Sequence, residues 1–421
     1  MLFWGFLIYL FLIFVRPQDF VPAVRGLPLV NMVLVPLIVC SLFQVLRGKR
    51  IDFKGVPQNN LMIAFWIVIV LSTLSVRWLQ YTLTTFIDWG KVVLTYFLIV
   101  LIIDSQKKLK ISVWAIVLCT TVTAILGVLQ AHGRDVTGVG LLHDGRITGV
   151  GIFGTNQLAL TLVFILPFVF GLFCLTKSSF ARILLCGIWG VYWYAIYLTG
   201  SRAGMLFGAS VPLLITVVFT RRNIVRIIGI IFTVLSLVVF SYFSSRMDTI
   251  GSYQEDSSAM GRIDVWGAGL SALKSTPFLG IGMGQFNTDY FERAPHSSYV
   301  EAVVELGLVG FFIWLGLFYF SLKRLRLIDI HKGGVVDDQA RIISKSLQVS
   351  LYAYLLGSLT SGNTYYPTLY ILFALVVAMQ KLTGMDFFKK QPLFAFRDLR
   401  NIAVIEFSVI LLIHILVRYS Y

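Results

Sequence analysis

Long apolar segments recur along the whole chain and limit what it can fold into. A helix needs about 20 apolar residues to cross the roughly 30 Å hydrocarbon core of a membrane. The chain is 57% hydrophobic and only 13% charged, whereas soluble domains are about a quarter charged. We therefore predict an all-α polytopic membrane protein with 12–13 transmembrane helices, the first and last of them short. The spans are expected near 2–15, 28–46, 61–76, 84–103, 111–131, 152–176, 183–199, 203–219, 227–245, 298–320, 346–360, 366–380 and 402–417.

Basic residues concentrate in every second connection between these spans. Six connections carry 4, 3, 2, 3, 6 and 5 Lys or Arg residues, which is 23 of the 35 in the chain. Loops rich in Lys and Arg face the cytoplasm, so we predict that these six do and that the N-terminus is cytoplasmic. One missed or invented internal span would break the alternation. The six connections are 47–60, 104–110, 177–182, 220–226, 321–345 and 381–400.

The remaining connections then face outward, and only 246–297 is long. Its segment 261–274 has a helix-like pattern, and 276–284 is rich in turn residues. Loops of this length inside compact folds are usually functional. We therefore divide the chain into an N-terminal transmembrane bundle (1–245), a periplasmic loop with short helices and catalytic elements (246–297), and C-terminal transmembrane helices (298–421).

Several classes of site are absent from the sequence. The net charge of +15 comes without a basic patch interleaved with aromatic residues, so no nucleic-acid partner is predicted. The outer loops contain no Asp-x-Asp, no His-Glu-x-x-His and no glycine-rich phosphate loop. We therefore predict neither a metal nor a cofactor. Four cysteines lie in apolar segments and are expected to be small packing residues: Cys40, Cys119, Cys174 and Cys186.

Among the arginines expected on the outer side, where the charge bias should remove them, three are candidate site residues. Arg202 stands where one span ends and the next begins, beside Gly200, Ser201 and Gly204. A guanidinium next to open backbone amides at a helix start suits a phosphate or diphosphate. The alternative is that such an arginine extends to lipid headgroups. The other two are Arg146, before a glycine-rich segment, and Arg262, at the start of the helix expected in the long loop.

His296 is a candidate general base. It follows Pro295 and directly precedes an expected span, so its imidazole is held at the membrane interface. A neutral imidazole there can take a proton from an incoming hydroxyl at physiological pH. The alternative is a polar surface residue.

Carboxylates inside expected spans form a second group. Glu301 and Glu305 lie one and two turns into the span after His296. Because charges inside a membrane face the bundle interior or a cavity, either of them can orient His296, pair with an arginine or satisfy a neighbouring polar group. Asp88 and Lys91 are three residues apart in one span and are expected to neutralise each other.

Several motifs in order resemble the O-antigen ligase and polymerase family. The segment 198–204, Leu-Thr-Gly-Ser-Arg-Ala-Gly, is similar to the family's Thr-x-Ser-Arg motif. Where the family commonly has His-Asn, this chain has His296-Ser297, which leaves the role of Ser297 open. The resemblance covers about 145–310. Its other parts are Arg146 through Asn156, Gly261 through Trp266, Pro277 through Phe286, and Glu305-Leu-Gly.

The resemblance implies a bacterial inner-membrane glycosyltransferase of the GT-C kind with a periplasmic site. Its donor would be an undecaprenyl-diphosphate-linked glycan, and its partners would include membrane lipids. Arg202 and Arg262, with Arg146, would hold the diphosphate, and Ser201 would support them. His296 would activate the acceptor hydroxyl, supported by Glu301 and Glu305. A sugar C1 on diphosphate already has a good leaving group, so fixed positive charge is the main assistance needed. Inversion without a metal is expected.

The acceptor stays open at this point. We favour ligation of O-antigen to the lipid A core over an O-antigen or exopolysaccharide polymerase and a protein O-oligosaccharyltransferase. A metal-dependent transferase would use Glu255 or Asp256 as its base. A lipid or solute transporter, lined by Asp88, Lys91 and Glu305, is the alternative from another class.

Overall fold

The computed structural model describes residues 2–49, 51–77, 79–140, 142–143, 145–150, 154–220, 222–243, 257–287, 294–330, 337–383 and 393–419. Almost all of these residues are helical, which confirms the predicted all-α class. The elements in chain order are α1 (Leu2–Phe14), α2 (Pro17–Phe20), η1 (Pro22–Val24), α3 (Leu29–Leu46), α4 (Pro57–Val76), α5 (Leu79–Ile102), α6 (Gln106–Ala131), β1 (Leu142–His143), β2 (Arg146–Ile147), α7 (Thr155–Leu175), α8 (Ser179–Leu198), α9 (Arg202–Phe219), α10 (Asn223–Phe243), α11 (Ser257–Ser275), η3 (Gln285–Asn287), α12 (Ser298–Ile330), α13 (Asp338–Gly357), α14 (Pro367–Leu382) and α16 (Phe396–Tyr419).

Every predicted span coincides with one of these helices. Within the described part of the chain, nine helices are long and apolar enough to cross a membrane. Three further apolar helices are shorter, namely α1, the start of α10, and α14. The remaining predicted span lies in α13, which is more polar and packs against α7, α9 and α12. The chain is therefore a multi-pass membrane protein.

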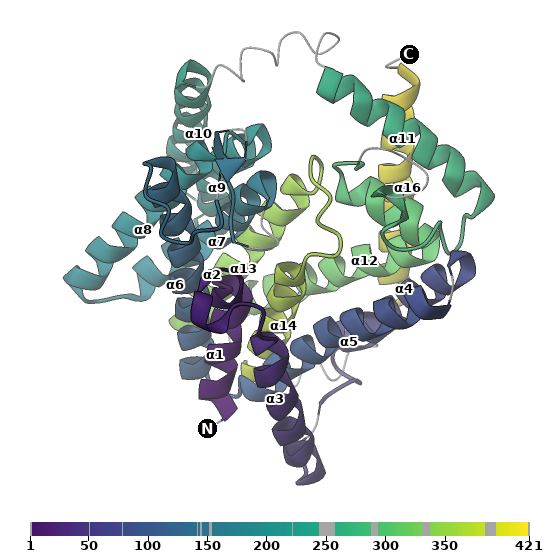
Figure 1. Ribbon diagram of the computed structural model, residues 1–421, viewed down its shortest axis with the longest axis horizontal. Coiled ribbons are helices and arrows are strands. Elements are labelled where there is room, and N and C mark those ends of the chain that lie inside the picture. Colours follow the sequence, from purple (N-terminus) through teal and green to yellow (C-terminus); the bar gives the residue numbers. More distant parts are fainter. Residues whose placement is uncertain are drawn as a thin grey trace.

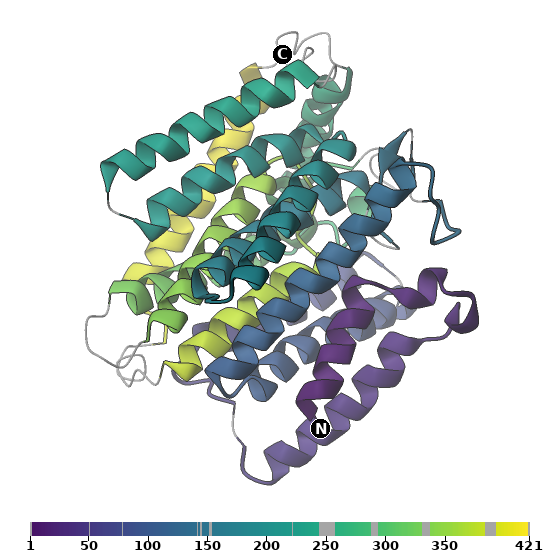
Figure 2. The ribbon, with the colours of Figure 1, turned by 90° about the vertical axis from the view of Figure 1, so that its left-hand side faces the viewer.

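The helices form two groups with a layer between them. Helices α6 to α10 lie together on one side, α11, α12 and α16 lie on the other, and α13 and α14 stand between (Figure 1). Helices α7 and α14 have buried residues all around, as expected of helices at the centre of a bundle. Viewed from the side, the tilted helices run next to one another, and α16 (yellow) extends along most of the bundle (Figure 2).

The six basic connections meet at one end of the bundle, which we call the basic end. Lys49 lies 3.5 Å from Asp104, which joins the first of these connections to the second. Lys323 and Asp398 form an ion pair of 2.6 Å between the fifth and the sixth. Gln339 Nε2 donates to Gln106 O at 3.3 Å. These contacts join the first, second, fifth and sixth connections, and Lys345 Nζ donates to Phe219 O, directly before the fourth, at 3.4 Å.

The opposite end, which we call the site end, holds the other connections. Arg146 bonds to Thr199 O there, and the side chain of Arg77 bonds to that of Gln285. Helix α16 reaches from Asp398 at the basic end to Val417, which lies 3.3 Å from the position of a Cβ on Gly267 of α11. The final apolar segment therefore runs the full distance between the two ends.

Two smaller expectations have different outcomes. Asp88 and Lys91 form the expected ion pair, with 2.9 Å between Nζ and Oδ1. The cysteines are only partly as expected. Cys119 is buried in the core, but Cys40, Cys174 and Cys186 lie exposed on their helices. Lipid can cover an exposed thiol as readily as a methyl group, so an apolar segment alone does not place its cysteine inside.

Candidate functional site

Arg146 and Arg202 come together at one turn of the site end. Arg146, in the short β1–β2 ribbon, donates from Nε to Thr199 O at 2.7 Å and from Nη2 to Asn156 Oδ1 at 3.4 Å. Gly200 has φ 58°, and a Cβ there would lie 3.3 Å from Arg146 Nε. Only glycine combines this backbone conformation with such a close approach. Arg146 therefore braces the turn 199–202, which contains Arg202 and which we call the arginine turn.

Arg202 is the first residue of α9. Ser201 precedes it as the N-cap, and its Oγ accepts a hydrogen bond from Gly204 N at 3.1 Å. The remaining backbone N–H groups of the first turn and the helix dipole favour an anion at this point. Ser201 thus supports the site by starting the helix, as a capping residue.

His296 occupies a second turn, 295–298, which leads into α12 and which we call the histidine turn. Its backbone is left-handed, with φ 47°, which is rare for a residue other than glycine. Partial burial of the imidazole holds the pKa of His296 below its ordinary value of 6.5, and the positive charge of Arg262 lowers it further. The histidine is therefore neutral at physiological pH, the form that can accept a proton. Arg262 of α11 is thus near enough for its charge to act on the imidazole.

Contacts from distant parts of the chain hold this turn. Trp266 of α11 donates from Nε1 to Pro295 O at 2.7 Å. Ser298 N donates to Ser358 O at 2.8 Å, and Ser298 Oγ donates to Ser361 O at 2.8 Å. We refer to the segment 358–364, which follows α13, as the clamp. The clamp carries no charge and no recognisable motif, so it could not be predicted. Trp266 ends one of the segments that resemble the family, but no role was predicted for it.

The carboxylates of Glu301 and Glu305 accept hydrogen bonds from backbone amides. Thr364 N in the clamp donates to Glu301 Oε2 at 3.0 Å. Gly284 N and Phe286 N donate to the two carboxylate oxygens of Glu305 at 2.9 and 3.1 Å. Of the roles considered from the sequence, these contacts match the satisfaction of neighbouring polar groups. Each glutamate fixes a segment beside the histidine turn, so each positions the site through the backbone.

The turn-rich segment 277–286 is inserted into a break in α12, which the sequence did not indicate. Gly307 has φ 66° and interrupts the helix. Leu308 N donates to Pro277 O at 2.8 Å, and Gly282 N donates to Glu305 O at 3.0 Å. A Cβ on Gly280 would lie 2.5 Å from the Glu305 backbone, so only glycine fits there. The expected single span 298–320 is therefore a broken helix with backbone packed against it, as occurs where chain lines a site within a membrane.

Helices α7 and α13 connect the two turns. Gly204 in the first turn of α9 packs on Ala159 of α7, where a Cβ would come within 2.5 Å. The neighbouring Leu160 lies 3.1 Å from the position of a Cβ on Gly357, the last residue of α13. The next residue, Ser358, holds the histidine turn. The arginine turn and the histidine turn therefore lie at the same end of the α7–α13 pair.

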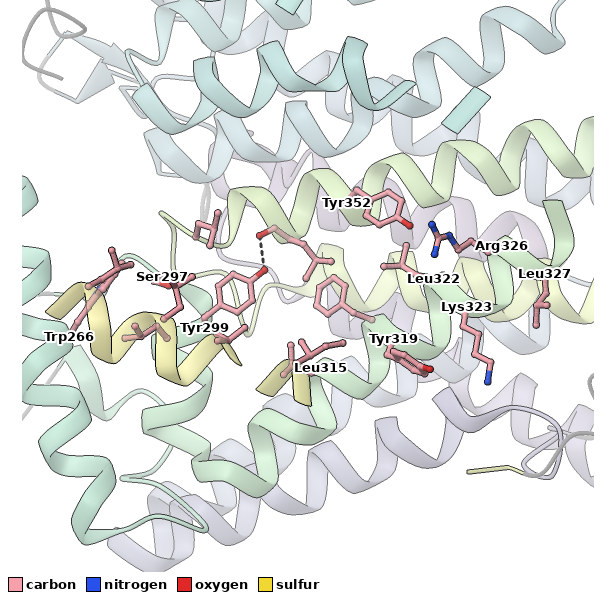
Figure 3. A pocket seen from close by; sticks show the side chains of 18 residues that line it. Trp266, Ser297, Tyr299, Leu315, Tyr319, Leu322, Lys323, Arg326, Leu327 and Tyr352 are labelled. Atoms are coloured by element: carbon pink, nitrogen blue, oxygen red, sulfur yellow. Dashed lines mark hydrogen bonds between the residues drawn. The ribbon is translucent and has the colours of Figure 1, made fainter. Parts of the chain in front are cut away.

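An apolar groove begins at the histidine turn. Its volume is about 620 Å³, and α12, α13 and α16 supply most of its walls. Trp266 and Ser297 lie at one end and Lys323 and Arg326 at the other (Figure 3). We call it the α12–α16 groove. It provides an apolar surface along these helices, and one end of this surface lies at Ser297, next to His296.

Some predictions fall outside the described residues. These include Glu255 and Asp256, the carboxylates considered for a metal-dependent reaction. In the part of the chain that the structure covers, no three His, Cys, Asp or Glu side chains group as metal ligands would.

Comparison with known proteins identifies the central part of the chain. Residues 188–315 match the family model described as O-antigen ligase. The chain is thus similar to the O-antigen ligase family over this segment. The matched segment contains Arg202, Arg262, His296 and both glutamates, whereas Arg146 precedes it. The family consists of ligases and polymerases that transfer glycans.

A curated relative points the same way. Over 124 residues the chain is 27% identical to the exopolysaccharide production protein ExoQ of Rhizobium meliloti (strain 1021). The alignment covers 25% of this chain and 28% of that protein's length. The match thus spans little more than a quarter of the length of this relative.

Proposed function

We propose that the protein transfers a glycan from undecaprenyl diphosphate to an acceptor hydroxyl at the site end. The observation that carries this proposal is His296, whose pKa is lowered by burial and by the charge of Arg262 and whose neighbour Ser297 lines the end of an apolar groove. The groove would take part of the isoprenoid chain of the donor, because its end at Trp266 and Ser297 lies at the turn that carries His296 (Figure 3). Such a chain requires an apolar surface of this kind.

In the proposed reaction the imidazole of His296 accepts the proton of the acceptor hydroxyl. The acceptor oxygen attacks C1 of the sugar while the bond from C1 to the diphosphate oxygen breaks. Arg202 and Arg262 stabilise the negative charge that develops on the departing diphosphate. Fixed guanidinium groups can replace a metal ion in this role, and a single displacement inverts the configuration at C1.

We favour the lipid A core as the acceptor, which would make the reaction O-antigen ligation. The second candidate is polymerisation, in which another lipid-linked glycan is the acceptor. The similarity to a protein of exopolysaccharide production supports that candidate. Transfer to a protein hydroxyl would use the same residues.

The test is transfer by the purified protein in nanodiscs with an undecaprenyl-diphosphate glycan. The core lipid and a second lipid-linked glycan are offered separately as acceptors, each with and without EDTA. We expect product from the core lipid and no effect of EDTA. Product only from the second glycan would identify a polymerase, and restoration by Mg²⁺ after EDTA would exclude the metal-free mechanism. An intact donor with both acceptors would favour a transporter.

We also propose that the site end faces the periplasm, with the N-terminus in the cytoplasm of a bacterial inner membrane. The test uses Ser179→Cys at the basic end and Ser271→Cys on α11, both exposed, in a parent without other cysteines. An impermeant maleimide added to intact cells should label Ser271→Cys only. Labelling of Ser179→Cys alone would reverse the orientation.

A further inference from the structure

A second polar pocket lies at the basic end, far along the bundle from the proposed catalytic residues. Its volume is about 510 Å³, and α9, α10, α12 and α13 line it. Three cations and one carboxylate contribute to its wall: Arg226, Arg326, Lys345 and Asp329. The pocket is thus positively charged overall. Arg326 also lines the far end of the α12–α16 groove, whereas the proposed reaction assigns no role to Arg226, Lys345 or Asp329.

The carboxylate in the wall does not neutralise all the cations. Asp329 lies 3.4 Å from Lys345 Nζ, which also donates to Phe219 O at 3.4 Å. Arg226 uses Nη2 to donate to Thr220 O at 3.3 Å, which holds its side chain in the wall. Asp329 is therefore associated with Lys345, and the two arginines supply the excess positive charge.

Buried donors in the same wall indicate an anionic acceptor. Gln348 is only 4% exposed, and its Nε2 has no hydrogen-bond partner among the residues that the structure describes. The Nε of Arg226 is likewise buried without an acceptor there. A buried donor left unsatisfied costs about 1–3 kcal/mol. An anion with several oxygen acceptors would satisfy both donors at once.

The rim of the pocket is apolar and reaches the exposed surface. Leu214 and Val217 of α9 and Ile330 of α12 form part of it. Val217 is 49% exposed and Ile330 is 62% exposed. Lipid phosphates lie at the level of helix ends, with their hydrocarbon chains directed into the membrane, and basic pockets between helices recognise such headgroups.

We propose that this pocket binds the phosphate of an anionic glycerophospholipid, with the acyl chains resting on the apolar rim. Arg226 and Arg326 contact the phosphate oxygens, and Gln348 donates to one of them. A bound lipid would join the α9–α10 pair to the ends of α12 and α13. A free phosphate compound offers the same oxygens, but it gains nothing from the apolar rim.

The experiment is native mass spectrometry of the full-length protein released from nanodiscs of phosphatidylcholine with one fifth phosphatidylglycerol. We expect the wild-type protein to retain phosphatidylglycerol selectively. Arg226→Gln and Arg326→Gln should each lower the retained fraction about tenfold, the factor expected when one charge-assisted hydrogen bond is lost. Gln348→Leu should lower it less, because it removes a neutral donor. Arg222→Gln is the matched control, since Arg222 is an exposed arginine of the same connection outside the pocket.

Three outcomes would overturn the proposal. The first is equal retention by the wild-type protein and the two arginine variants. The second is an equal loss in Arg222→Gln, which would mean that general surface charge attracts the lipid. The third is displacement of the lipid by millimolar inorganic phosphate, which would identify a soluble phosphate compound as the ligand. Thermal unfolding of each variant in neutral detergent should match the wild type, so that retention reports binding and not misfolding.

Discussion

Two turns at the site end present the proposed catalytic residues, and they are held in different ways. The turn 199–202 contains Gly200 with φ 58°, and the turn 295–298 contains His296 with φ 47°. Each precedes a long helix. A left-handed backbone is nearly free of cost for glycine, but it costs roughly 1–2 kcal/mol for a residue with a side chain. The histidine turn therefore carries strain that the arginine turn avoids.

The source of support differs accordingly. In the arginine turn, Ser201 caps the helix from within the same segment, and Arg146 adds one brace. The histidine turn depends on Trp266 and on the clamp, which lie about 30 residues before it and 60 residues after it. Strained residues persist at functional sites when surrounding contacts determine them. We infer that the fold tolerates strain in order to fix the direction of the imidazole.

The largest expected effect follows from removing that imidazole. His296→Ala should reduce single-turnover transfer by roughly 10²–10⁴-fold, the usual contribution of a general base. Donor affinity should change little, because the arginines are proposed to hold the diphosphate. His414→Ala, at an exposed position on α16, is the control and should transfer normally. Loss of donor binding in His296→Ala with turnover preserved at saturation would make the histidine a donor ligand.

The arginine turn should respond in donor affinity as well as in rate. Arg202→Gln should weaken donor binding and slow transfer, roughly 10–100-fold in the combined specificity constant, because its contacts tighten as charge builds on the leaving oxygen. Arg202→Lys should recover only part of this loss, since an ammonium cannot make a forked contact with two oxygens. Arg134→Gln, an exposed arginine in a connection at the site end, is the matched control. Full activity of Arg202→Lys would reduce the role of Arg202 to that of a point charge.

The same contrast explains how far the sequence predicts the molecule. Apolar segments and basic connections place the helices and sort their ends, because a membrane imposes both patterns locally. The arginine turn can also be predicted from the sequence, because its helix cap and its turn involve only the neighbouring residues Gly200, Ser201 and Arg202. The clamp, Trp266 and the insertion of 277–286 into α12 are long-range contacts. No local pattern specifies which backbone amide will meet Glu301 or Glu305.

A smaller effect is expected in the pH dependence of kcat/KM. Transfer should be constant above pH 6.5 and should fall below it as His296 takes up a proton, because its pKa lies below 6.5. Arg262→Gln removes a neighbouring positive charge, so the pKa should rise and the decline should begin at higher pH. Stability follows the same direction. As the pH falls below about 6.5, the unfolded chain binds this proton first, and the folded protein loses stability. A decline at the same pH in both proteins would remove the electrostatic link between Arg262 and His296.

The smallest expected effects are on stability, and in both turns glycine should be more stable than alanine at the left-handed position. His296→Gly should be more stable than His296→Ala by about 1 kcal/mol, because glycine accepts the left-handed backbone that alanine resists. Gly200→Ala should likewise destabilise the protein, by a similar amount or more, since its Cβ would also approach Arg146 Nε to 3.3 Å. Unfolding in mixed micelles, with the midpoints of all three variants compared, measures both differences. If His296→Gly and His296→Ala unfold together while Gly200→Ala is destabilised, the backbone at 296 relaxes once the imidazole is gone. The strain would then be maintained by the side chain and not by the clamp, and Trp266 and Ser298 would lose the role assigned to them here.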